Sequence, residues 1–578
     1  MLKYKCENCN GIECETSICP ICSNKTKLIE TKIFWCDNCN VPNFEEKCSC
    51  CGEKGHYIGT DIRPVFPEER LMIEIILKKE FEFCNSSVWN TTGNNYIVDG
   101  KKIKFSVKDT VNNINVNELR RKITELKKEN IKYEKNFYEN KYIKTFIQTN
   151  RDRLNEITNE AISYIQKSVK NNQNCDMFVS FSGGKDSTVT SDITMRALGR
   201  EDIIHIYGDT TLEYFTTKEY IKRFKEKHKL TPMLVAQNKE QDFNELCKII
   251  GPPSRMMRWC CTIFKTGAIT RKIEATFKDS QNILAFQGIR RSESTARSKY
   301  DRESRESKIA KQIAIAPIID WLEFDVWLYI LSNNIDFNDA YRYGYSRVGC
   351  WCCPNNSSWS EFLSELYMKD KYDKFHNVLL DFAKEIGKPD PIEYVKEGGW
   401  KARQGGNGLD FSKNVIVEVK PCALIEDTYN FDLNRPIDSN LYELFKPFGQ
   451  VNFSIGNKRL NEVYVLNKKT NVPLLKLTGK IGQNNLKVTI LGKEGPFKEN
   501  KKAEMLIRNQ ITKFQTCIGC LACESQCKYN AIKIFNIGKR EYIDYKIDSS
   551  KCVGCLNCVT HFSGGCYMKK ILRTKKGE

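Results

Sequence analysis

Apolar and polar residues alternate along residues 173–412 in a pattern that predicts a parallel sheet covered by helices. Four short apolar runs, at 177–181, 203–208, 233–236 and 283–287, are separated by longer stretches whose apolar residues have helical spacing. Short buried strands that alternate with helices are typical of α/β folds with helices on both faces of the sheet. Ligands bind such sheets at the carboxyl ends of the strands, so the residues that follow these runs are the first candidates for a binding site.

The other parts of the chain have different patterns. Residues 56–115 contain a predicted hairpin that turns at Asp99-Gly100. Residues 116–172 have the spacing of helices, and one face carries Leu154, Ile157, Ala161, Ile162 and Ile165. Residues 413–500 have the pattern of strands and turns. We therefore expect a multidomain α/β protein with six regions: 1–55, 56–115, 116–172, 173–412, 413–500 and 501–578.

A glycine-rich loop directly follows the first apolar run of the α/β region. Its residues are Ser182, Gly183, Gly184, Lys185, Asp186 and Ser187, and a predicted helix follows them from Thr188 to Leu198. The backbone N–H groups of a new helix are unpaired and its dipole favours an anion, so this loop is suited to phosphate. The loop differs from the G-x-x-x-x-G-K-[ST] type, because Lys185 is followed by aspartate.

Charged residues also follow the second and fourth apolar runs. Asp209 and Glu213 come after the second run, and Arg290, Arg291 and Arg297 come after the fourth. If the four runs form one parallel sheet, these side chains lie at the same edge as the glycine-rich loop. For the arginines the alternative is simple solvation at the surface.

The 578 residues contain 27 cysteines, most of them in C-x-x-C pairs, and a formal net charge of +19. In a reducing compartment such pairs indicate metal ligands, and with no apolar run long enough for a membrane span we expect a cytoplasmic protein without a membrane partner. The positive charge suggests a polyanionic partner. However, five Cys₄ metal sites would lower it to roughly +9, which weakens the case for nucleic acid.

Two groups of four cysteines lie in residues 1–55. Their spacing predicts two zinc ribbons, in which tetrahedral thiolate ligation replaces a hydrophobic core. Rubredoxin-like iron is the alternative, because the spacing does not separate the two metals. The predicted ligands are Cys6, Cys9, Cys19 and Cys22 for the first site and Cys36, Cys39, Cys48 and Cys51 for the second.

The last region has two cysteine motifs that resemble those of a bacterial two-cluster ferredoxin, in which the fourth cysteine of each motif ligates the other [4Fe–4S] cluster. The resemblance implies Cys517, Cys520, Cys523 and Cys566 for one cluster, and Cys527, Cys552, Cys555 and Cys558 for the other. Two departures concern Cys566: seven residues precede it where the family often has three, and Tyr567 stands where the family often has proline.

The α/β region carries four further cysteines, Cys260, Cys261, Cys350 and Cys353, in "RWCCTIFK" and "YSRVGCWCCPN". With "SGGKDS", "DTTLEY" and "GIRRSES", these segments resemble the APS and PAPS reductases of the PP-loop family in their order along the chain. The resemblance implies a Rossmann-like sheet, a third [4Fe–4S] cluster held by those four cysteines, and an adenine nucleotide. The implied nucleotide-binding residues are Ser182, Gly183, Gly184, Lys185, Asp186, Ser187, Asp209, Arg290 and Arg291.

Two departures from the reductases leave the reaction open. The chain lacks the reductase tail whose cysteine attacks sulfur, Cys422 is only a weak substitute, and we assign no catalytic nucleophile. Lys185 also stands in a loop position where reductases commonly lack lysine, and it is suited to the extra phosphates of ATP.

Three functions are therefore compatible with the sequence. The first is reduction of a sulfonucleotide, APS or PAPS, to sulfite with electrons from a donor that pass through the ferredoxin-like region. The second is an ATP pyrophosphatase, with Mg as a further cofactor, that adenylates a nucleic acid for sulfur insertion. The third is an electron-transfer scaffold without catalysis.

Overall fold

The computed structural model describes residues 4–9, 12–14, 19–24, 27–28, 31–305, 309, 311–538 and 543–573. The chain divides into two compact units. The first unit contains residues 1–235, 279–307 and 312–372, and the second contains residues 236–278, 308–311 and 373–578. In the described parts no helix is both long enough and apolar enough to cross a membrane.

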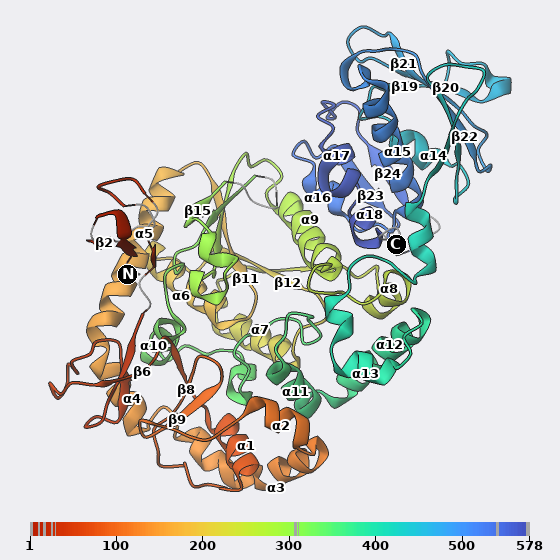
Figure 1. Cartoon of the computed structure of the whole chain (residues 1–578). Coiled ribbons are helices and arrows are strands. Elements are labelled where there is room, and N and C mark those ends of the chain that lie inside the picture. The colour runs from red at the N-terminus through yellow and green to blue at the C-terminus, as the bar shows by residue number, and fades with distance from the viewer. Residues whose placement is uncertain are drawn as a thin grey trace. The chain divides into compact units, whose positions relative to one another are not determined.

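A six-stranded sheet organises the first unit, with the strand order β13-β12-β11-β14-β16-β15 (Figure 1). Its strands are β11 (Asp176–Phe181), β12 (Ile204–Asp209), β13 (Met233–Gln237), β14 (Ile283–Gln287), β15 (Glu303–Ser304) and β16 (Gln312–Ile315). The register pairs β11 with β12 and β14, and β14 with β16, as parallel neighbours, while β15 is antiparallel. The four predicted strands are confirmed to within one residue. The sequence pattern missed β15 and β16, which have only two and four residues.

Helices that pack on this sheet bury its apolar residues. They include α5 (Arg151–Asn171), α6 (Lys185–Leu198), α7 (Phe215–Lys227) and α10 (Glu323–Ser332). Val179 and Phe286 from the sheet share one core with Ile193 of α6 and Trp327 of α10. The predicted apolar face of residues 154–165 is confirmed, because Ile157, Ala161 and Ile165 of α5 join that core.

The N-terminal part of the first unit consists of short strands and helices. Its strands are β1 (Tyr4–Cys6), β2 (Ile12–Cys14), β3 (Lys27–Leu28), β4 (Ile33–Cys36), β5 (Val41–Asn43), β6 (His56–Gly59), β7 (Ile62–Pro64), β8 (Val88–Thr91), β9 (Asn95–Val98) and β10 (Lys101–Lys102). Its helices are α1 (Pro67–Leu77), α2 (Val107–Asn113), α3 (Val116–Lys135) and α4 (Lys141–Thr149), with η1 (Glu7–Cys9) before them. The predicted hairpin is confirmed: Asp99 and Gly100 both have positive φ between β9 and β10, as its two-residue turn requires.

The remaining helical segments of the first unit follow the sheet. They are η3 (Arg291–Glu293), η4 (Arg297–Lys299), η5 (Asp339–Tyr343) and α11 (Ser358–Tyr367). Helix α12 (Lys369–Glu385) begins in the first unit and continues into the second.

A six-stranded antiparallel sheet forms the β-rich part of the second unit, in the order β17-β18-β22-β21-β20-β19 (Figure 1). The strands are β17 (Glu418–Pro421), β18 (Thr428–Asp432), β19 (Gln450–Asn452), β20 (Glu462–Leu466), β21 (Pro473–Thr478) and β22 (Asn485–Ile490). Its core joins Leu475 and Val488 of the sheet to Ile507 and Phe514 of α15 (Asn500–Thr516). The prediction that residues 413–500 are rich in β-strand is confirmed.

The other elements of the second unit surround the ferredoxin-like region. They are α8 (Phe243–Ile250), the π-helix η2 (Cys261–Thr266), α9 (Gly267–Thr276), α13 (Pro391–Lys396), η6 (Gly399–Ala402), η7 (Asp410–Val415), α14 (Ser439–Glu443), η8 (Lys458–Leu460), η9 (Gly495–Phe497), α16 (Ala522–Gln526), β23 (Ile532–Phe535), β24 (Asp544–Ile547), α17 (Asn557–Gly564) and α18 (Tyr567–Leu572). Strands β23 and β24 pair antiparallel. Thus the segment that carries Cys260 and Cys261 belongs to the same compact unit as residues 501–578.

A buried ion pair holds α1 to the small sheet of β7–β10. Arg63 on β7 donates to both carboxylate oxygens of Glu69 at 2.7 Å each, and the Tyr96 hydroxyl donates to Glu69 Oε1 at 2.7 Å. All three side chains are buried. Loss of one partner would leave an uncompensated charge without water, which is a large penalty.

We expect Glu69→Ala to reduce the free energy of unfolding around α1 by about 3–5 kcal/mol, because it leaves Arg63 buried and unpaired. Amide hydrogen exchange of α1 measures this change. The matched control is Glu82→Ala, which breaks the exposed Lys79–Glu82 pair at 2.7 Å and should cost less than about 1 kcal/mol. Equal effects of the two substitutions would contradict the assignment.

Candidate functional site

The glycine-rich loop lies between the end of β11 and the first residue of α6. Gly183 has φ +73°, and Gly184 is the N-cap residue of α6 without a side-chain cap. Serine hydroxyls close the loop, because Ser187 Oγ donates to Gly184 O at 2.8 Å and accepts from Ser182 N at 3.2 Å. The uncapped N-terminus of a 14-residue helix therefore faces the loop, which is an arrangement suited to an anion.

Gly288, directly after β14, allows the sheet to approach this loop. A Cβ atom at position 288 would lie 2.6 Å from the carbonyl carbon and oxygen of Asp186 and 2.7 Å from Ser187 N. Only a glycine permits this close backbone contact. It fixes the end of β14, and the arginines that follow it, beside the start of α6.

Lys185 is buried and its ammonium group already has protein partners. Its Nζ donates to Ser346 O at 3.0 Å and lies 3.3 Å from Glu323 Oε1 and 3.7 Å from Asp186 Oδ2. Burial lowers the pKa of Lys185, but the charges of Asp186 and Glu323 raise it by more, so the net shift is upward. The lysine is therefore a fixed positive charge at the beginning of α6.

The two predicted arginines have different surroundings. Arg290 is buried, and its Nε donates to Asp186 Oδ1. Burial raises the pKa of Asp186, but the charges of Arg290 and Lys185 lower it by more. Arg291 is partly exposed, pairs with Asp320 and donates to Tyr300 O at 3.1 Å. The loop aspartate is thus ionised and held by Arg290 and Lys185.

Asp209, at the end of β12, begins a second loop at the same edge of the sheet. Its Oδ1 accepts from Thr211 N at 2.8 Å, and its Oδ2 lies 3.7 Å from Lys218 Nζ. Four residues on, Glu213 is buried and accepts from Thr210 N at 2.9 Å and from Thr210 Oγ1 at 2.6 Å. Burial raises the pKa of Glu213.

The Cys350–Cys353 loop is attached to that second loop. Trp351 N donates to Leu212 O at 2.9 Å, and Thr210 Oγ1 lies 3.4 Å from Cys350 Sγ. The loop closes on itself where Cys353 N donates to Cys350 O at 3.2 Å. Cys350 therefore lies next to the residues that follow β12, at the carboxyl edge of the sheet.

Cys260 and Cys261 stand at the start of the π-helix η2 in the second unit. Single turns of π-helix occur frequently at functional sites. The assembly of these two cysteines with Cys350 and Cys353 into one cluster stays a prediction.

Three residues near the loop were missed by sequence reasoning. Tyr341 accepts from Lys185 N at 2.9 Å, Glu323 pairs with Lys185, and Asp61 accepts from Glu323 N at 2.9 Å. Burial raises the pKa of Asp61 to about 6, and the charge of Glu323 adds to the rise. Asp61 is about 120 residues before the loop, so no local pattern links the two.

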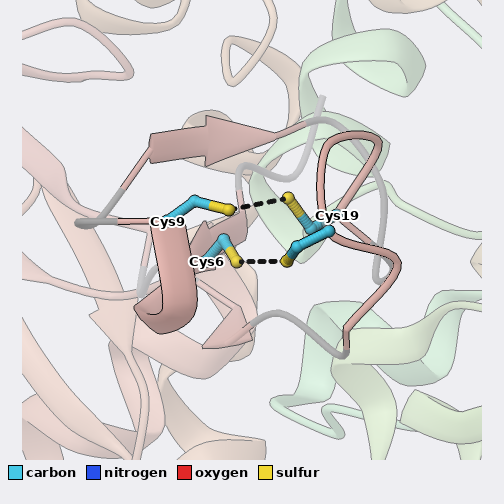
Figure 2. A group of neighbouring side chains, drawn as sticks. Cys6, Cys9 and Cys19 are labelled. Atoms are coloured by element: carbon cyan, nitrogen blue, oxygen red, sulfur yellow. Dashed lines mark hydrogen bonds between the residues drawn. The ribbon is translucent and has the colours of Figure 1, made fainter.

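The first N-terminal cysteine group has the geometry of a small metal site. Its four sulfurs lie within 4.8 Å of one another, with 3.4 Å between Cys6 and Cys22 and 3.8 Å between Cys9 and Cys19. Figure 2 shows that the side chains of Cys6, Cys9 and Cys19 direct their sulfur atoms toward one another. Four thiolates around one tetrahedral metal at 2.3 Å are about 3.8 Å apart, so the group fits a single ion.

The second N-terminal group has the same geometry. Cys36 and Cys51 sulfurs lie 3.3 Å apart, Cys39 and Cys48 sulfurs 3.6 Å apart, and all four are within 4.8 Å. A backbone hydrogen bond from Glu53 lowers the pKa of Cys51 to about 7, whereas burial raises the pKa of Cys36 to about 11. The identity of the metal, zinc or iron, stays a prediction.

The ferredoxin-like region shows an internal repeat. Gly519 and Leu521 of the first motif have φ +69° and +60°, and the corresponding Gly554 and Leu556 of the second have +69° and +61°. The same backbone turn therefore brings each C-x-x-C-x-x-C motif around its site.

The charges near two of these cysteines can be compared with the two sets that the resemblance implies. Burial raises the pKa of Cys517, and the charges of Cys523 and Cys566 add to it. Burial likewise raises the pKa of Cys558 to about 12; the charge of Lys513 opposes the rise, and the charges of Cys523, Cys552 and Cys527 add to it. The neighbours of Cys566 and Cys527 agree with the predicted exchange of the fourth ligands, although the individual ligand assignments stay predictions.

Two buried polar groups between these sets fit iron–sulfur clusters. The Tyr545 hydroxyl is buried beside Cys523, and burial together with the charge of Cys523 raises its pKa. Burial lowers the pKa of Lys513, whereas the charges of Cys523, Cys558 and Cys566 raise it by more. A donor and a cation directed at buried thiolates suit the negative sulfurs of a cluster.

A separate cavity of about 420 Å³ lies among residues 65–143 of the first unit. Its lining includes Arg70, Cys84, Trp89 and Tyr133, and none of the predicted site residues. The prediction of nucleotide binding therefore rests on the loop, the helix terminus and the buried charges, not on the size of a cavity.

Comparison with known proteins identifies two parts of the chain. Residues 176–356 match the phosphoadenosine phosphosulfate reductase domain, and residues 516–561 match the 4Fe-4S dicluster domain. The chain therefore contains a segment similar to the PAPS reductase domain and a segment similar to the 4Fe-4S dicluster domain, and two groups of four cysteines suited to a metal precede them. The expected fold class is confirmed, and the domains indicate an enzyme that uses a nucleotide.

Individual relatives are similar over parts of their length. An uncharacterized protein of Methanocaldococcus jannaschii is 30% identical over 264 residues, which are 45% of this chain and 61% of that protein. An adenosine 5'-phosphosulfate reductase of Lysinibacillus sphaericus is 29% identical over 30% of this chain and 70% of its own. The solved phosphoadenylyl-sulfate reductase of Candida auris, a phosphate complex, has a TM-score of 0.27 and 14% identity, and the match covers 35% of this chain and 96% of that one.

We expect Cys39→Ser to remove one of two N-terminal metal ions, because serine does not replace a thiolate ligand. Elemental analysis of metal bound to the purified protein measures the loss. Cys50→Ser is the matched control, since Cys50 is exposed in the same segment and lies outside the group of four. Retention of both ions in the Cys39 variant, or loss in the Cys50 variant, would contradict the site.

We expect Gly288→Ala to weaken the binding of AMP at least tenfold, because the new Cβ displaces the start of α6. Gly199→Ala is the control. Gly199 ends α6 with φ +63° and open space around it, so its replacement should cost about 1 kcal/mol of stability and leave AMP affinity unchanged. Calorimetric titration with AMP measures both, and equal affinities in the two variants would refute the role of the contact.

Proposed function

We propose that this protein reduces a sulfonucleotide, APS or PAPS, to sulfite with electrons that pass through its ferredoxin domain. The matches to the PAPS reductase domain and to the 4Fe-4S dicluster domain support an enzyme that uses a nucleotide. The packing of residues within the second unit supports reduction through the ferredoxin domain.

The observation that carries the proposal is the packing of the ferredoxin domain on the segment that follows Cys260 and Cys261. Arg271 of α9 donates to both carboxylate oxygens of Glu524 at 3.0 Å each. Gln241 donates to Ile518 O at 2.8 Å. A Cβ at Gly267 would lie only 2.9 Å from the Leu521 Cβ, so the first ferredoxin motif contacts α9 closely.

Tyr567 extends this contact to the cysteines themselves. Burial raises the pKa of its hydroxyl to about 12, a hydrogen bond with Thr262 opposes the rise, and the charges of Cys520 and Cys261 add to it. One tyrosine is thus close to a ligand of the first ferredoxin site and to the cysteine pair of the reductase domain. A permanent contact of this kind suits electron delivery within one chain.

In the proposed reaction, the protein binds and orients the nucleotide. The loop and the N-terminus of α6 hold its phosphate, while Arg290 and Arg291 supply positive charge where the sulfate oxygens gather. The bond between sulfur and the bridging phosphate oxygen breaks, sulfur gains two electrons and leaves as sulfite, and the nucleotide leaves with that oxygen. Bound [4Fe–4S] clusters would supply the two electrons one at a time.

The proposed [4Fe–4S] clusters would be held by cysteines. The predicted ligands are two sets of four cysteines in the ferredoxin domain and, in the reductase domain, Cys260, Cys261, Cys350 and Cys353. Three clusters and two zinc ions, or rubredoxin-type iron in place of zinc, remain the proposed cofactors. The physiological electron donor is a further partner of this proposal.

The second candidate function is an ATP pyrophosphatase that adenylates a nucleic acid for sulfur insertion. It is favoured by Lys185 at the start of α6, where a pyrophosphate would bind, and by the two N-terminal metal sites. Under this alternative Mg would accompany ATP, and the acceptor would be tRNA or DNA.

The test is an anaerobic incubation of the purified chain with APS, PAPS or ATP, with and without dithionite, while sulfite and pyrophosphate are measured. We expect sulfite, dependent on reductant. Arg290→Gln should reduce its rate at least 100-fold and more than Lys185→Gln does, because Arg290 supplies positive charge to the reacting sulfate group, whereas Lys185 lies at the start of α6 beside the phosphate.

Arg200→Gln serves as the matched control, since Arg200 is exposed and pairs with Asp202 at 2.6 Å just beyond the other end of α6. Its rate should equal that of the unmodified protein. Pyrophosphate from ATP in the presence of tRNA or DNA, with no sulfite from either sulfonucleotide, would refute the reductase and support its alternative.

A further inference from the structure

Lys513 is a buried lysine in the ferredoxin domain that the proposed reaction does not use. It lies on the last part of α15, where residues 509–516 are all buried. Its side chain is almost completely inaccessible, with 1% of the residue exposed. A lysine in such a place needs a specific counter-charge, because removal of an ammonium group from water costs several kcal/mol.

The described residues offer Lys513 no carboxylate partner within 4 Å. Its Nζ donates to the backbone oxygen of Cys558, and the Tyr545 ring centre lies 6.0 Å away. Neither group carries the negative charge that would balance a buried ammonium. The negative charge that balances the Lys513 ammonium must therefore come from another group near it.

Cysteines of both ferredoxin sets surround Lys513. The charges that act on it most strongly are those of Cys523, Cys558, Cys566 and Cys517. Cys517, Cys523 and Cys566 belong to the first predicted set, and Cys558 belongs to the second. Lys513 therefore contacts Cys558 of the second predicted set through its Nζ, and it lines the same small pocket as Cys517 of the first set.

Two other basic residues of the second unit, Arg435 and Lys569, have their positive charge compensated in different ways. Arg435 donates to Asp438 at 2.6 Å, so a carboxylate neutralises it. Lys569 donates to Asn509 Oδ1 at 2.9 Å and is partly exposed, so water solvates its charge. Among these three, Lys513 alone is both fully buried and without a carboxylate.

We propose that Lys513 is the shared buried counter-cation of both ferredoxin clusters and raises the reduction potential of each. This inference rests on the two clusters that the proposed function uses, but not on the identity of the nucleotide. An iron–sulfur cluster becomes more negative when it accepts an electron, so a nearby positive charge stabilises the reduced state. Burial strengthens the effect, because little water is present to screen it.

The test is a potentiometric titration of the full chain, purified without oxygen and free of nucleotide, followed by electron paramagnetic resonance. We expect Lys513→Gln, which keeps a hydrogen-bond donor but removes the charge, to lower both ferredoxin midpoint potentials by at least 59 mV. That shift is a tenfold change in a one-electron equilibrium constant. Lys513→Arg, which keeps the charge, should restore most of it.

Lys528→Gln is the matched control, because Lys528 directly follows the predicted ligand Cys527 but is exposed to water. It should shift the potentials far less than Lys513→Gln. Full iron content with unchanged potentials in Lys513→Gln would overturn the proposal, as would equal shifts in Lys513→Gln and Lys513→Arg.

The iron content of each variant shows whether its ferredoxin clusters have assembled. Loss of iron in Lys513→Gln with retention in Lys513→Arg supports a required charge, whereas loss in both overturns it, since shape alone then matters. Because no nucleotide is present, a failure to produce sulfite leaves this result intact. An unmodified chain without ferredoxin iron would contradict both proposals.

Discussion

Balance of buried charge is the constraint on which the nucleotide site depends. Asp186 is held between Arg290 and Lys185, and Lys185 is shared with Glu323. Each of these groups would be costly to bury alone, because an isolated ion loses its hydration without compensation. Together they fix the start of α6 and the end of β14 in one arrangement, and Gly288 permits the backbone contact that brings them together.

Sulfur and metal take the place of a hydrophobic core at the N-terminus. Among the described residues of the segment around the first four cysteines, the buried cluster consists of the cysteines themselves. A unit of this size does not bury enough apolar surface to fold alone, so ligation of a metal must supply the missing free energy. The ferredoxin domain differs, since Ile532, Ile547 and Phe514 give it an apolar core that continues into the β-rich sheet.

The sequence predicted what depends on local pattern. The four longer strands, the hairpin at Asp99-Gly100 and the loop before α6 follow from periodicity and from glycine, and the structure has them. Strand β16 was missed because its four residues are too few to show alternation. Asp61 was missed because its link to Glu323 joins positions more than 250 residues apart, and only the folded chain reveals such a contact.

The charge arrangement also bears on the choice between the two functions. An anionic nucleotide that binds Arg290 must compete with Asp186, which already accepts its hydrogen bond. A sulfonucleotide that wins this competition leaves the Asp186 carboxylate with Lys185 as its remaining partner. ATP brings more negative charge to the same place, and a carboxylate displaced toward polyphosphate is stabilised best by a divalent cation. The reductase therefore requires only the protein's own charges at the loop, whereas the ATP-cleaving alternative requires Mg beside Asp186.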